Sequence, residues 1–357
     1  MTALDFRSDT VTLPTDQMRR AMAAADVGDD QYGEDRTVNR LQELSAELVG
    51  KEAALFVASG MMGNLCGVLS QTERGDEVIL GELAHLFQNE VGGYAVFGGL
   101  HPRTVPQTRP CPALADIAAA IRPKSYNFPR SALLCLENTH NWLGGAVLTP
   151  EDTKAAADLA HSRGLRVHLD GARLFNAAVA LGVDARELTR HVDTVQFCFS
   201  KGLAAPVGSI ICGTRDTIER ARKIRKMLGG AMRQAGVIAA AAIVALETMR
   251  DRLVDDHVNA RRLADGLAEL EGITIDPARV DTNIVAFELD ANVPGEAFRD
   301  ACAAEGLRIS AYGGNWRRLR MVTHYGIQRD DVDVALAIMR RALAGVRGPI
   351  AAGSRLT

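Results

Sequence analysis

A lysine that directly follows an apolar, strand-like run is the first residue of this sequence whose type and place could do chemistry. In the stretch HVDTVQFCFSKGLAAPVGSI, residues 191–210, Lys201 follows a run of β-branched and aromatic residues at 194–199. The carboxyl end of a strand in an α/β sheet points into the crevice where such sheets bind ligands. The alternative is a surface lysine whose stem lies along apolar surface. This stretch alone leaves both interpretations open.

An aspartate ends a second strand-like run, in RVHLDGARLFNA, where Asp170 follows Leu169 and precedes Gly171. It lies 31 positions before Lys201 (201 − 170), which leaves room for one helix and the next strand. A buried carboxylate is costly unless it meets a positive partner. That partner could be Lys201, in a structural ion pair, or the protonated ring nitrogen of a bound cofactor.

A turn rich in small residues, in ASGMMGNLCGVLS, is a candidate anion site. Ser59, Gly60 and Met61 stand where the strand-like run AALFVA gives way to helical periodicity. Small residues there leave backbone N–H groups bare at a helix N-terminus, which readily binds phosphate. The alternative is a tight turn with an ordinary N-cap. The segment has neither GxxxxGK[ST] nor GxGxxG spacing, which argues against nucleotides. The sequence has no HExxH-type cluster, so we expect no catalytic metal.

Together these three features favour pyridoxal 5′-phosphate as the cofactor. This cofactor needs an amine for its Schiff base, an acid beside its pyridine nitrogen and dipoles for its phosphate. Lys201, Asp170 and the turn at Ser59 and Gly60 would supply them in that order. A protonated ring nitrogen makes the ring an electron sink for a carbanion at the substrate Cα.

The elements that must position these residues alternate between short apolar runs and helical patterns. The strand-like runs are AALFVAS, EVILG, ALLCLEN, RVHLDG, TVQFCFS and GSIICG. Pro150 and Gly164 bracket a helix between two of them, and the Ala-rich stretch 236–249 predicts a long buried helix. Such alternation predicts an α/β fold with a largely parallel sheet covered by helices. We expect a large domain at 1–249, a small α+β domain at 250–346 and a frayed tail at 347–357.

Composition places the chain among ordinary globular proteins. Of its 357 residues, 47% are hydrophobic and 24% charged, and the net charge of −3 is spread along the chain. Nothing in this balance favours nucleic acid or a membrane surface as a partner. Six scattered cysteines without a CxxC pair favour a reducing compartment. The N-terminal MTALDFRSDTVTLP has no targeting pattern, and no apolar run reaches membrane-spanning length, so we expect a cytoplasmic protein.

Over nearly its whole length the sequence resembles the L-threonine aldolases, fold type I pyridoxal-phosphate enzymes of the aromatic amino acid β-eliminating lyase group. The stretches that carry the resemblance are FRSDTVTLPT, VGDDQYGED, LVGKEAALF, AHLFQNEVGG, LENTHN, HLDGARLFNA, SKGLAAPVGS, KMLGGAMRQAG and RMVTHYG, in family order. The resemblance implies a mainly parallel sheet of seven strands, a small C-terminal domain, and a homotetramer of paired dimers with active sites at the dimer interface. The implied reaction is reversible cleavage of L-threonine, L-allo-threonine or β-phenylserine to glycine and an aldehyde.

The resemblance also implies roles for single residues. Lys201 forms the Schiff base, Asp170 pairs with the pyridine nitrogen, and His85 stacks on the cofactor ring. The other residues expected to hold the cofactor are Ser59, Gly60, Met61, Arg173, Ser200 and Arg233. The residues expected to meet the substrate are Ser8, Tyr32, Asn89, Asn127, Arg173 and Arg320. Arginine suits the substrate carboxylate because its planar fork binds both oxygens, and Tyr32 and Arg233 are similar to residues that the family lends across the interface.

The sequence departs from the family at two places. Many members have Gly-Thr at the phosphate turn, whereas this chain has Gly60 and Met61, so one hydroxyl donor is lost. Asn89 and Asn127 occupy positions around the substrate β-carbon that are often aromatic or histidine. Two smaller amides would leave space for a phenyl ring, so we expect β-phenylserine to be preferred to threonine.

Alternatives stay open at this stage. The base that takes the β-hydroxyl proton could be His85, His140 or an ordered water. Another pyridoxal-phosphate enzyme, a β-eliminating lyase or an aminotransferase, would share Lys201 and Asp170. A non-catalytic protein of the same fold is the third possibility.

Overall fold

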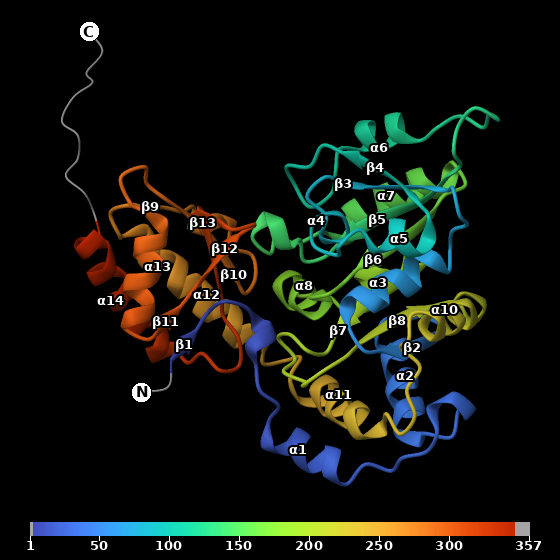
Figure 1. Ribbon diagram of the computed structural model, residues 1–357, viewed down its shortest axis with the longest axis horizontal. Helices are drawn as coiled ribbons and strands as arrows, with labels where there is room; N and C mark the ends of the chain where they lie inside the picture. The colour runs from blue at the N-terminus through green and yellow to red at the C-terminus, as the bar shows by residue number, and fades with distance from the viewer. Residues whose placement is uncertain (1–2, 347–357) are drawn as a thin grey trace. The chain divides into compact units, whose positions relative to one another are not determined.

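The protein divides into two compact units. The structure is a computed structural model that describes residues 3–346 (Figure 1). The large unit is Thr12–Val254, and the small unit joins Met1–Val11 to Asp255–Thr357. The sequence analysis placed the N-terminal segment in the large domain and set the boundary at residue 249. The segment groups with the small unit because β1 (Leu4–Asp5) pairs in parallel with β11 (Leu307–Arg308). The expected tail, 347–357, lies outside the described residues.

A seven-stranded, mainly parallel sheet forms the centre of the large unit, in the order β2–β8–β7–β6–β5–β3–β4. Only β8 (Ser209–Gly213) runs antiparallel to its neighbours. The other strands are β2 (Ala53–Val57), β3 (Glu77–Gly81), β4 (His101–Val105), β5 (Ser131–Glu137), β6 (Arg166–Asp170) and β7 (Thr194–Cys198). The predicted fold class is therefore confirmed. Each of the six strand-like runs forms a strand, whereas β4 was not anticipated.

Helices pack against this sheet and against one another. They are α1 (Asp16–Ala23), α2 (Arg36–Leu48), α3 (Gly60–Leu69), α4 (His85–Gln88), α5 (Gly93–Gly98), α6 (Leu114–Ala120), α7 (Pro150–Ser162), α8 (Leu174–Leu181), α9 (Ala185–Thr189), α10 (Arg215–Met227) and α11 (Gly236–Thr248), with short 3-10 turns η2 (Asp30–Tyr32) and η3 (Asn141–Leu143). The Thr149 hydroxyl caps α7 by accepting the Asp152 N–H, and Pro150 occupies the first turn, where its missing N–H costs nothing. The Ala-rich stretch forms α11, as predicted, and α11 packs against α1 and α2.

An aromatic layer fixes the end of β7. The Phe197 ring meets Phe175 and Phe199 edge to face, with ring centroids 5.2 and 5.5 Å apart. All three rings are buried in the main core cluster of the large unit. Aromatic pairs of this geometry stabilise by about 1 kcal/mol each beyond area burial. These contacts anchor the end of β7 and Phe199, which lies two residues before Lys201.

The small unit contains an antiparallel sheet in the order β12–β13–β10–β9. Its strands are β9 (Ile273–Thr274), β10 (Ile284–Leu289), β12 (Ser310–Tyr312) and β13 (Asn315–Val322), and its helices are η1 (Asp9–Val11), α12 (Leu253–Ala268), η4 (Pro277–Arg279), α13 (Gly295–Ala304) and α14 (Arg329–Val346). Within this unit, Figure 1 shows the blue β1 beside the red-orange β11. The runs NIVAFEL and RLRMVTH supply β10 and β13, as expected for an α+β domain.

Two further expectations concern the compartment. All six cysteines are buried, and their thiols are free. Within residues 3–346, no helix combines the length and the apolar character needed to cross a membrane.

Candidate active site

Asp170 is the last residue of β6, and only 4% of its surface is exposed. Its Oδ1 accepts hydrogen bonds from Gln196 Nε2 at 2.6 Å and from the Ala172 N–H at 3.1 Å. Its Oδ2 accepts one from Asn64 Nδ2 at 2.9 Å. Gln196 lies opposite Asp170 in the β6–β7 ladder, and Asn64 is carried by α3, which packs on the same two strands. The carboxylate is therefore held in one orientation by three donors.

The surroundings of Asp170 keep it ionised. Burial raises the pKa of this carboxyl, but the positive charges of His85 and Lys201 and the hydrogen bonds from Asn64 and Gln196 outweigh burial. The net result is a pKa below the ordinary value for aspartate. A buried, ionised carboxylate is what a protonated pyridine nitrogen needs beside it.

His85 begins α4 just after β3, at the carboxyl edge of the sheet where β6 also ends. Its Nδ1 lies 2.9 Å from Glu90 Oε1, and Glu137 accepts a hydrogen bond from its backbone N–H at 2.7 Å. Burial lowers the pKa of His85, but the bond to Glu90 and the charges of Asp170 and Glu137 outweigh burial and raise the pKa. Because Glu90 engages Nδ1, Nε2 is the ring nitrogen left to meet a ligand.

His85, Glu90 and Asp170 also have the chemistry of metal ligands, with one ligand atom from each lying within 4.8 Å of the others. Two of these groups are committed to other partners. Both oxygens of Asp170 accept hydrogen bonds, and Glu90 Oε1 meets Asn64 Nδ2 as well as His85 Nδ1. Both carboxylates of the cluster therefore already have hydrogen-bond partners among the described residues.

The N-terminus of α3 has the features expected of a phosphate site. Ser59 is its N-cap, in extended conformation, and its hydroxyl accepts the Met62 N–H at 3.2 Å. The N–H groups of Gly60 and Met61 stand in the first turn, where a helix has no intrahelical acceptor. A Cβ at Gly60 would come within 2.9 Å of Cys198 Sγ, so only glycine fits there without a shift. The geometry of this turn is compatible with a phosphate held by its backbone, and that role stays a prediction.

Lys201 lies three residues beyond β7, in the loop that leads to β8. It is half-buried, as is Ser200 beside it. Its carbonyl accepts hydrogen bonds from the Ala204 N–H at 2.8 Å and the Thr12 hydroxyl at 3.2 Å, which hold the loop. The charge of Lys201 contributes to the low pKa of Asp170, and the shared site expected for the two groups stays a prediction.

Two predicted arginines and a tyrosine lie in the large unit. Arg173 is 6% exposed and precedes α8, three residues after Asp170. Arg233 pairs with Asp29 at 3.1 Å, and its carbonyl accepts the Asp30 N–H, which brings it to the turn that carries Tyr32. Tyr32 itself is 73% exposed. Arg233 and Tyr32 thus belong to one surface of the large unit.

Ser8 and Arg320, the other expected carboxylate ligands, lie in the small unit. Arg320 Nη2 donates to the Arg7 carbonyl at 3.3 Å, so the guanidinium lies beside the residue before Ser8. The Ser8 hydroxyl accepts the Thr10 N–H at 3.2 Å. The structure brings these two residues together, and their roles toward the substrate stay a prediction.

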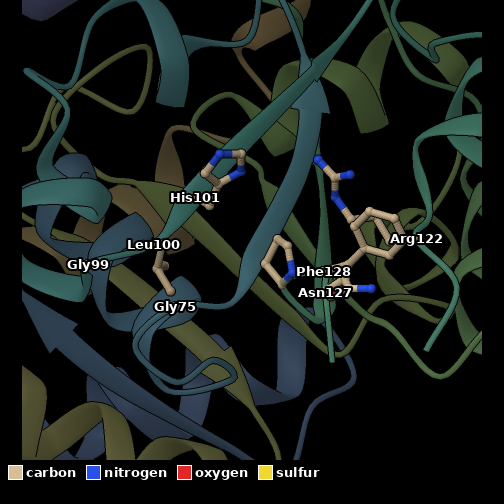
Figure 2. A pocket seen from close by; sticks show the side chains of 8 residues that line it. Gly75, Gly99, Leu100, His101, Arg122, Asn127 and Phe128 are labelled. Atoms are coloured by element: carbon tan, nitrogen blue, oxygen red, sulfur yellow. The ribbon is translucent and has the colours of Figure 1, made fainter. Parts of the chain in front are cut away.

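The two asparagines assigned to the substrate β-carbon are not neighbours within one chain. Asn89 follows α4 and accepts a hydrogen bond from the Trp142 indole at 2.7 Å. Asn127 lines a pocket of about 540 Å³ with Gly75, Gly99, Leu100, His101, Arg122, Phe128 and Pro129 (Figure 2). That pocket lies where β3, β4 and β5 begin, whereas Asp170 and His85 follow strand ends. In a parallel sheet these are opposite edges, so the chain's own Asn127 does not face its own Asp170.

Several buried polar residues of the site were not predicted from the sequence. They are Asn64, Glu90, Glu137, His168, Thr194 and Gln196. The available signal was a polar residue inside an apolar run, as in RVHLDG and TVQFCFS. That signal does not say which partner the residue will meet.

A seven-stranded sheet, a strand-end lysine, an ionised aspartate and a backbone phosphate turn define a pyridoxal-phosphate-dependent enzyme of fold type I. The model of the beta-eliminating lyase family matches residues 5–291. The chain is 45% identical over 355 residues to low-specificity L-threonine aldolase 1 of Arabidopsis thaliana, covering 98% of this chain and 99% of that protein. Its identity to the low specificity L-threonine aldolase of Escherichia coli K12 is 43% over 348 residues, with 96% and 99% covered.

Solved structures agree on the fold. The threonine aldolase of Leishmania major superposes with a TM-score of 0.81 at 18% identity, covering 95% of this chain and 99% of that one. The chain therefore belongs to the beta-eliminating lyase family, and the resemblance to the L-threonine aldolases is confirmed. Its cofactor is pyridoxal 5′-phosphate, and it is a lyase of that class.

Proposed function

We propose that this enzyme is a low-specificity L-threonine aldolase that reversibly cleaves L-β-hydroxy-α-amino acids into glycine and an aldehyde. The observation that carries the proposal is the charge of Lys201 acting on the ionised Asp170, whose pKa it helps to lower, in a chain that matches named aldolases over nearly its full length. The substrate class is thus small amino acids with a hydroxyl on Cβ.

The proposed roles follow from the chemistry of each group. The cofactor, when bound, supplies an electron sink for breaking the Cα–Cβ bond. Asp170 holds a proton on the ring nitrogen, and the N–H groups of Gly60 and Met61 hold the phosphate. Arg173 and Arg320, with Ser8, bind the substrate carboxylate and so orient the bond to be broken.

The proton of the β-hydroxyl must also be taken up, and of the two histidines His85 is the better supported base. Its Nε2 remains available because Glu90 engages Nδ1, and about a third of its side chain is exposed. His140 is fully buried, and neither of its ring nitrogens has a hydrogen-bond partner among the described residues. A substrate cannot reach a nitrogen that solvent does not reach. An ordered water stays the alternative to His85.

The assay that tests the proposal offers the purified holoenzyme L-threonine, L-allo-threonine, L-serine and an aromatic β-hydroxy amino acid. We expect glycine and the matching aldehyde. Pyruvate with ammonia would identify a β-eliminating lyase, and a keto acid with an aminated cofactor would identify an aminotransferase. Cofactor binding without turnover of any amino acid would overturn the proposal.

We further propose that aromatic β-substituents are accepted beside Asn89. This residue is exposed and bonded to the Trp142 indole, so apolar ring surface flanks the amide, and Phe87, two residues earlier, is 38% exposed. A phenyl ring buried there would contribute roughly 2 kcal/mol. The argument now depends on Asn89 alone, because Asn127 lies at the other sheet edge of its own chain.

The resulting prediction concerns specificity. The enzyme should cleave β-phenylserine with a kcat/KM at least about tenfold higher than that for threonine, because ring burial favours the larger substrate. Asn89→Phe should reduce this ratio by filling the space, whereas Asn292→Phe makes the same change at an exposed amide of the small unit and should leave the ratio unchanged. Steady-state kinetics with both substrates decide the matter. A parent enzyme that prefers threonine would refute the pocket argument.

The quaternary proposal is a homotetramer of paired dimers. Tyr32 and Arg233 lie together on one surface, which fits residues lent to a second subunit, and Asn127 lies at the sheet edge opposite its own Asp170. Sedimentation analysis tests this directly. A holoenzyme that stays monomeric at assay concentration would contradict it.

A further inference from the structure

A buried chain of side chains leads from the core of the large unit to Asp170. Asn64 Nδ2 lies 2.9 Å from Asp170 Oδ2 and 2.7 Å from Glu90 Oε1. Its Oδ1 lies 3.0 Å from His168 Nε2. The ionised carboxylate of Asp170 can only accept hydrogen bonds, so the amide must turn its NH₂ group toward Asp170. The second N–H of the amide then donates to Glu90 Oε1, although burial raises the pKa of Glu90. The amide oxygen then accepts, and His168 must carry its proton on Nε2.

The hydrogen bonds on the other side of His168 fix the direction of donation along this network. Its Nδ1 lies 2.8 Å from the Thr194 hydroxyl, which in turn accepts a hydrogen bond from Gln71 Nε2 at 2.7 Å. A neutral imidazole protonated on Nε2 can only accept at Nδ1, so Thr194 donates to it. Each hydrogen therefore points the same way, from Gln71 through Thr194, His168 and Asn64 to the acids.

The side chains of this network are buried and tightly packed. Asn64, Glu90 and Asp170 are at most 4% exposed, and His168 and Thr194 are fully buried. Gly67, one turn after Asn64 on α3, lies so close that a Cβ there would come 2.5 Å from His168 Cε1. Burial also lowers the pKa of His168 to about 4, although the charge of Asp170 opposes this, so the ring is neutral near neutral pH.

We propose that His168 and Asn64 are positioning residues for the cofactor ring: His168 fixes the Asn64 amide, which holds Asp170 toward the ring nitrogen and, through Glu90, holds His85 against the ring face. The proposal rests on the cofactor roles given to Asp170 and His85 above. It assigns no contact with substrate to either positioning residue. One amide thus aligns two groups that come from different strand ends.

The first test uses the cofactor-free protein. With imidazole nitrogens labelled, the ¹⁵N spectrum should show His168 as the neutral Nε2–H form from about pH 8 to about pH 5. The His168→Gln variant identifies its signals. A signal for the Nδ1–H form, or a titration near the ordinary histidine pKa, would overturn the proposal.

The second test compares two substitutions in the holoenzyme. His168→Leu removes the donor to Asn64, whereas His168→Gln keeps an N–H near the same place. Loss of one oriented bond to a charged group should weaken pyridoxal phosphate binding about ten- to a hundredfold in the leucine variant. It should also lower the pKa of the ring nitrogen, read from ¹⁵N-labelled cofactor. The glutamine variant should stay within about threefold of the parent.

A purely structural role predicts a different pattern. His168→Leu would then lose stability to denaturant while binding the cofactor and protonating its ring as the parent does, and that result sinks the proposal. If His168→Leu does not fold, Thr194→Val and Thr194→Ser make the same comparison. Thr153→Val is the control, because it removes a buried hydroxyl that is not part of this hydrogen-bond network. None of these readouts uses an amino-acid substrate, so failure of the aldolase assay is distinguishable from failure here.

Discussion

Asp170 shows how a single residue can be prepared for its role by its neighbours. Three hydrogen bonds and two positive charges outweigh the cost of burying its carboxylate. All of these hydrogen bonds and charges come from the protein's own residues. Preorganised groups of this kind supply a large part of the rate enhancement of enzymes.

Removing only the charge of Asp170 should therefore reduce activity severely. Asp170→Asn keeps the shape but cannot hold a proton on the ring nitrogen, so kcat should fall by several orders of magnitude while the cofactor still binds at Lys201. Steady-state kinetics and the visible spectrum of the bound cofactor measure the two effects. Asp158→Asn, an exposed carboxylate paired with Lys154, is the control. An Asp170→Asn enzyme as active as the parent would contradict the role.

His168 makes a prediction about acid stability. Its pKa in the folded protein is lowered by burial to about 4, below the ordinary value of 6.5. Between these values the unfolded chain binds a proton that the folded chain does not, so stability is present above about pH 6.5 and is lost as the pH falls. The loss between pH 7 and pH 5 should be about 2 kcal/mol for this residue.

Urea unfolding of the cofactor-free protein at both pH values measures the loss. His168→Gln removes the titrating group, so its free energy of unfolding should fall less than the parent's over the same interval. Other titrating groups remain in both proteins and cancel in the comparison. Equal losses in parent and variant would show that His168 does not stay neutral.

At the residue scale, the sequence was sufficient to predict functional residues whose type is unusual for their position. A lysine and an aspartate at strand ends have few structural roles, so Lys201 and Asp170 could be predicted. Asn64 and His168 could not, because a polar residue in an apolar run has many possible partners. Asn127 shows the opposite limit, since its position in the sequence does not reveal which sheet edge it faces.

At the scale of elements, α3 combines two tasks in one helix. Its first turn offers backbone N–H groups to a phosphate, and its inner face carries Asn64 and Gly67 toward β6 and β7. Six buried residues out of the ten in this helix explain why its sequence reads as apolar rather than amphipathic. In the proposed site, one rigid element would thus position both the cofactor phosphate and, through Asn64, its ring.

Gly67→Ala tests the inner face of α3. Alanine favours a helix by about 1 kcal/mol, but its Cβ would lie 2.5 Å and 2.7 Å from His168 Cε1 and Nδ1, atoms of a rigid, trapped ring. We expect a net loss of about 1–3 kcal/mol in the free energy of unfolding and weaker cofactor binding. Gly345→Ala in α14, with nothing within 4 Å of the new Cβ, should leave both unchanged or slightly improved. Equal behaviour of the two variants would refute the close packing.

The elements themselves were mostly predictable, and the exception has a physical reason. Strands buried on both faces form continuous apolar runs, as β7 and β8 do, and these were recognised. The edge strand β4 has the sequence HPRTV, in which only Val105 is buried. A proline is tolerated at a sheet edge, so such a strand resembles a loop in sequence. The grouping of the N-terminal segment with the small unit has no local signal, because β1 consists of two residues whose pairing partner lies about 300 positions away.

At the scale of the whole molecule, one chain leaves its proposed site incomplete. Large apolar side chains of the large unit are exposed, among them Tyr32, Val91, Val96, Phe97 and Met227. Exposed apolar surface of this kind marks interaction sites in soluble proteins. Arg233 and Tyr32 lie on the same unit's surface, which fits residues lent to a partner subunit.

Mixing inactive variants tests whether sites are shared. Lys201→Ala and Arg233→Ala should each be nearly inactive as homo-oligomers, because one lacks the amine and the other the lent arginine. When the two chains are unfolded and refolded together, half of the random dimers contain one of each. In such a dimer one of the two sites has both residues intact, so activity should recover to about a quarter of the parent's. The control mixes Lys201→Ala with Asp170→Asn, two residues of the same chain's site, and should recover nothing. No recovery in the first mixture, with oligomers shown to have exchanged chains, would mean that Arg233 serves its own subunit.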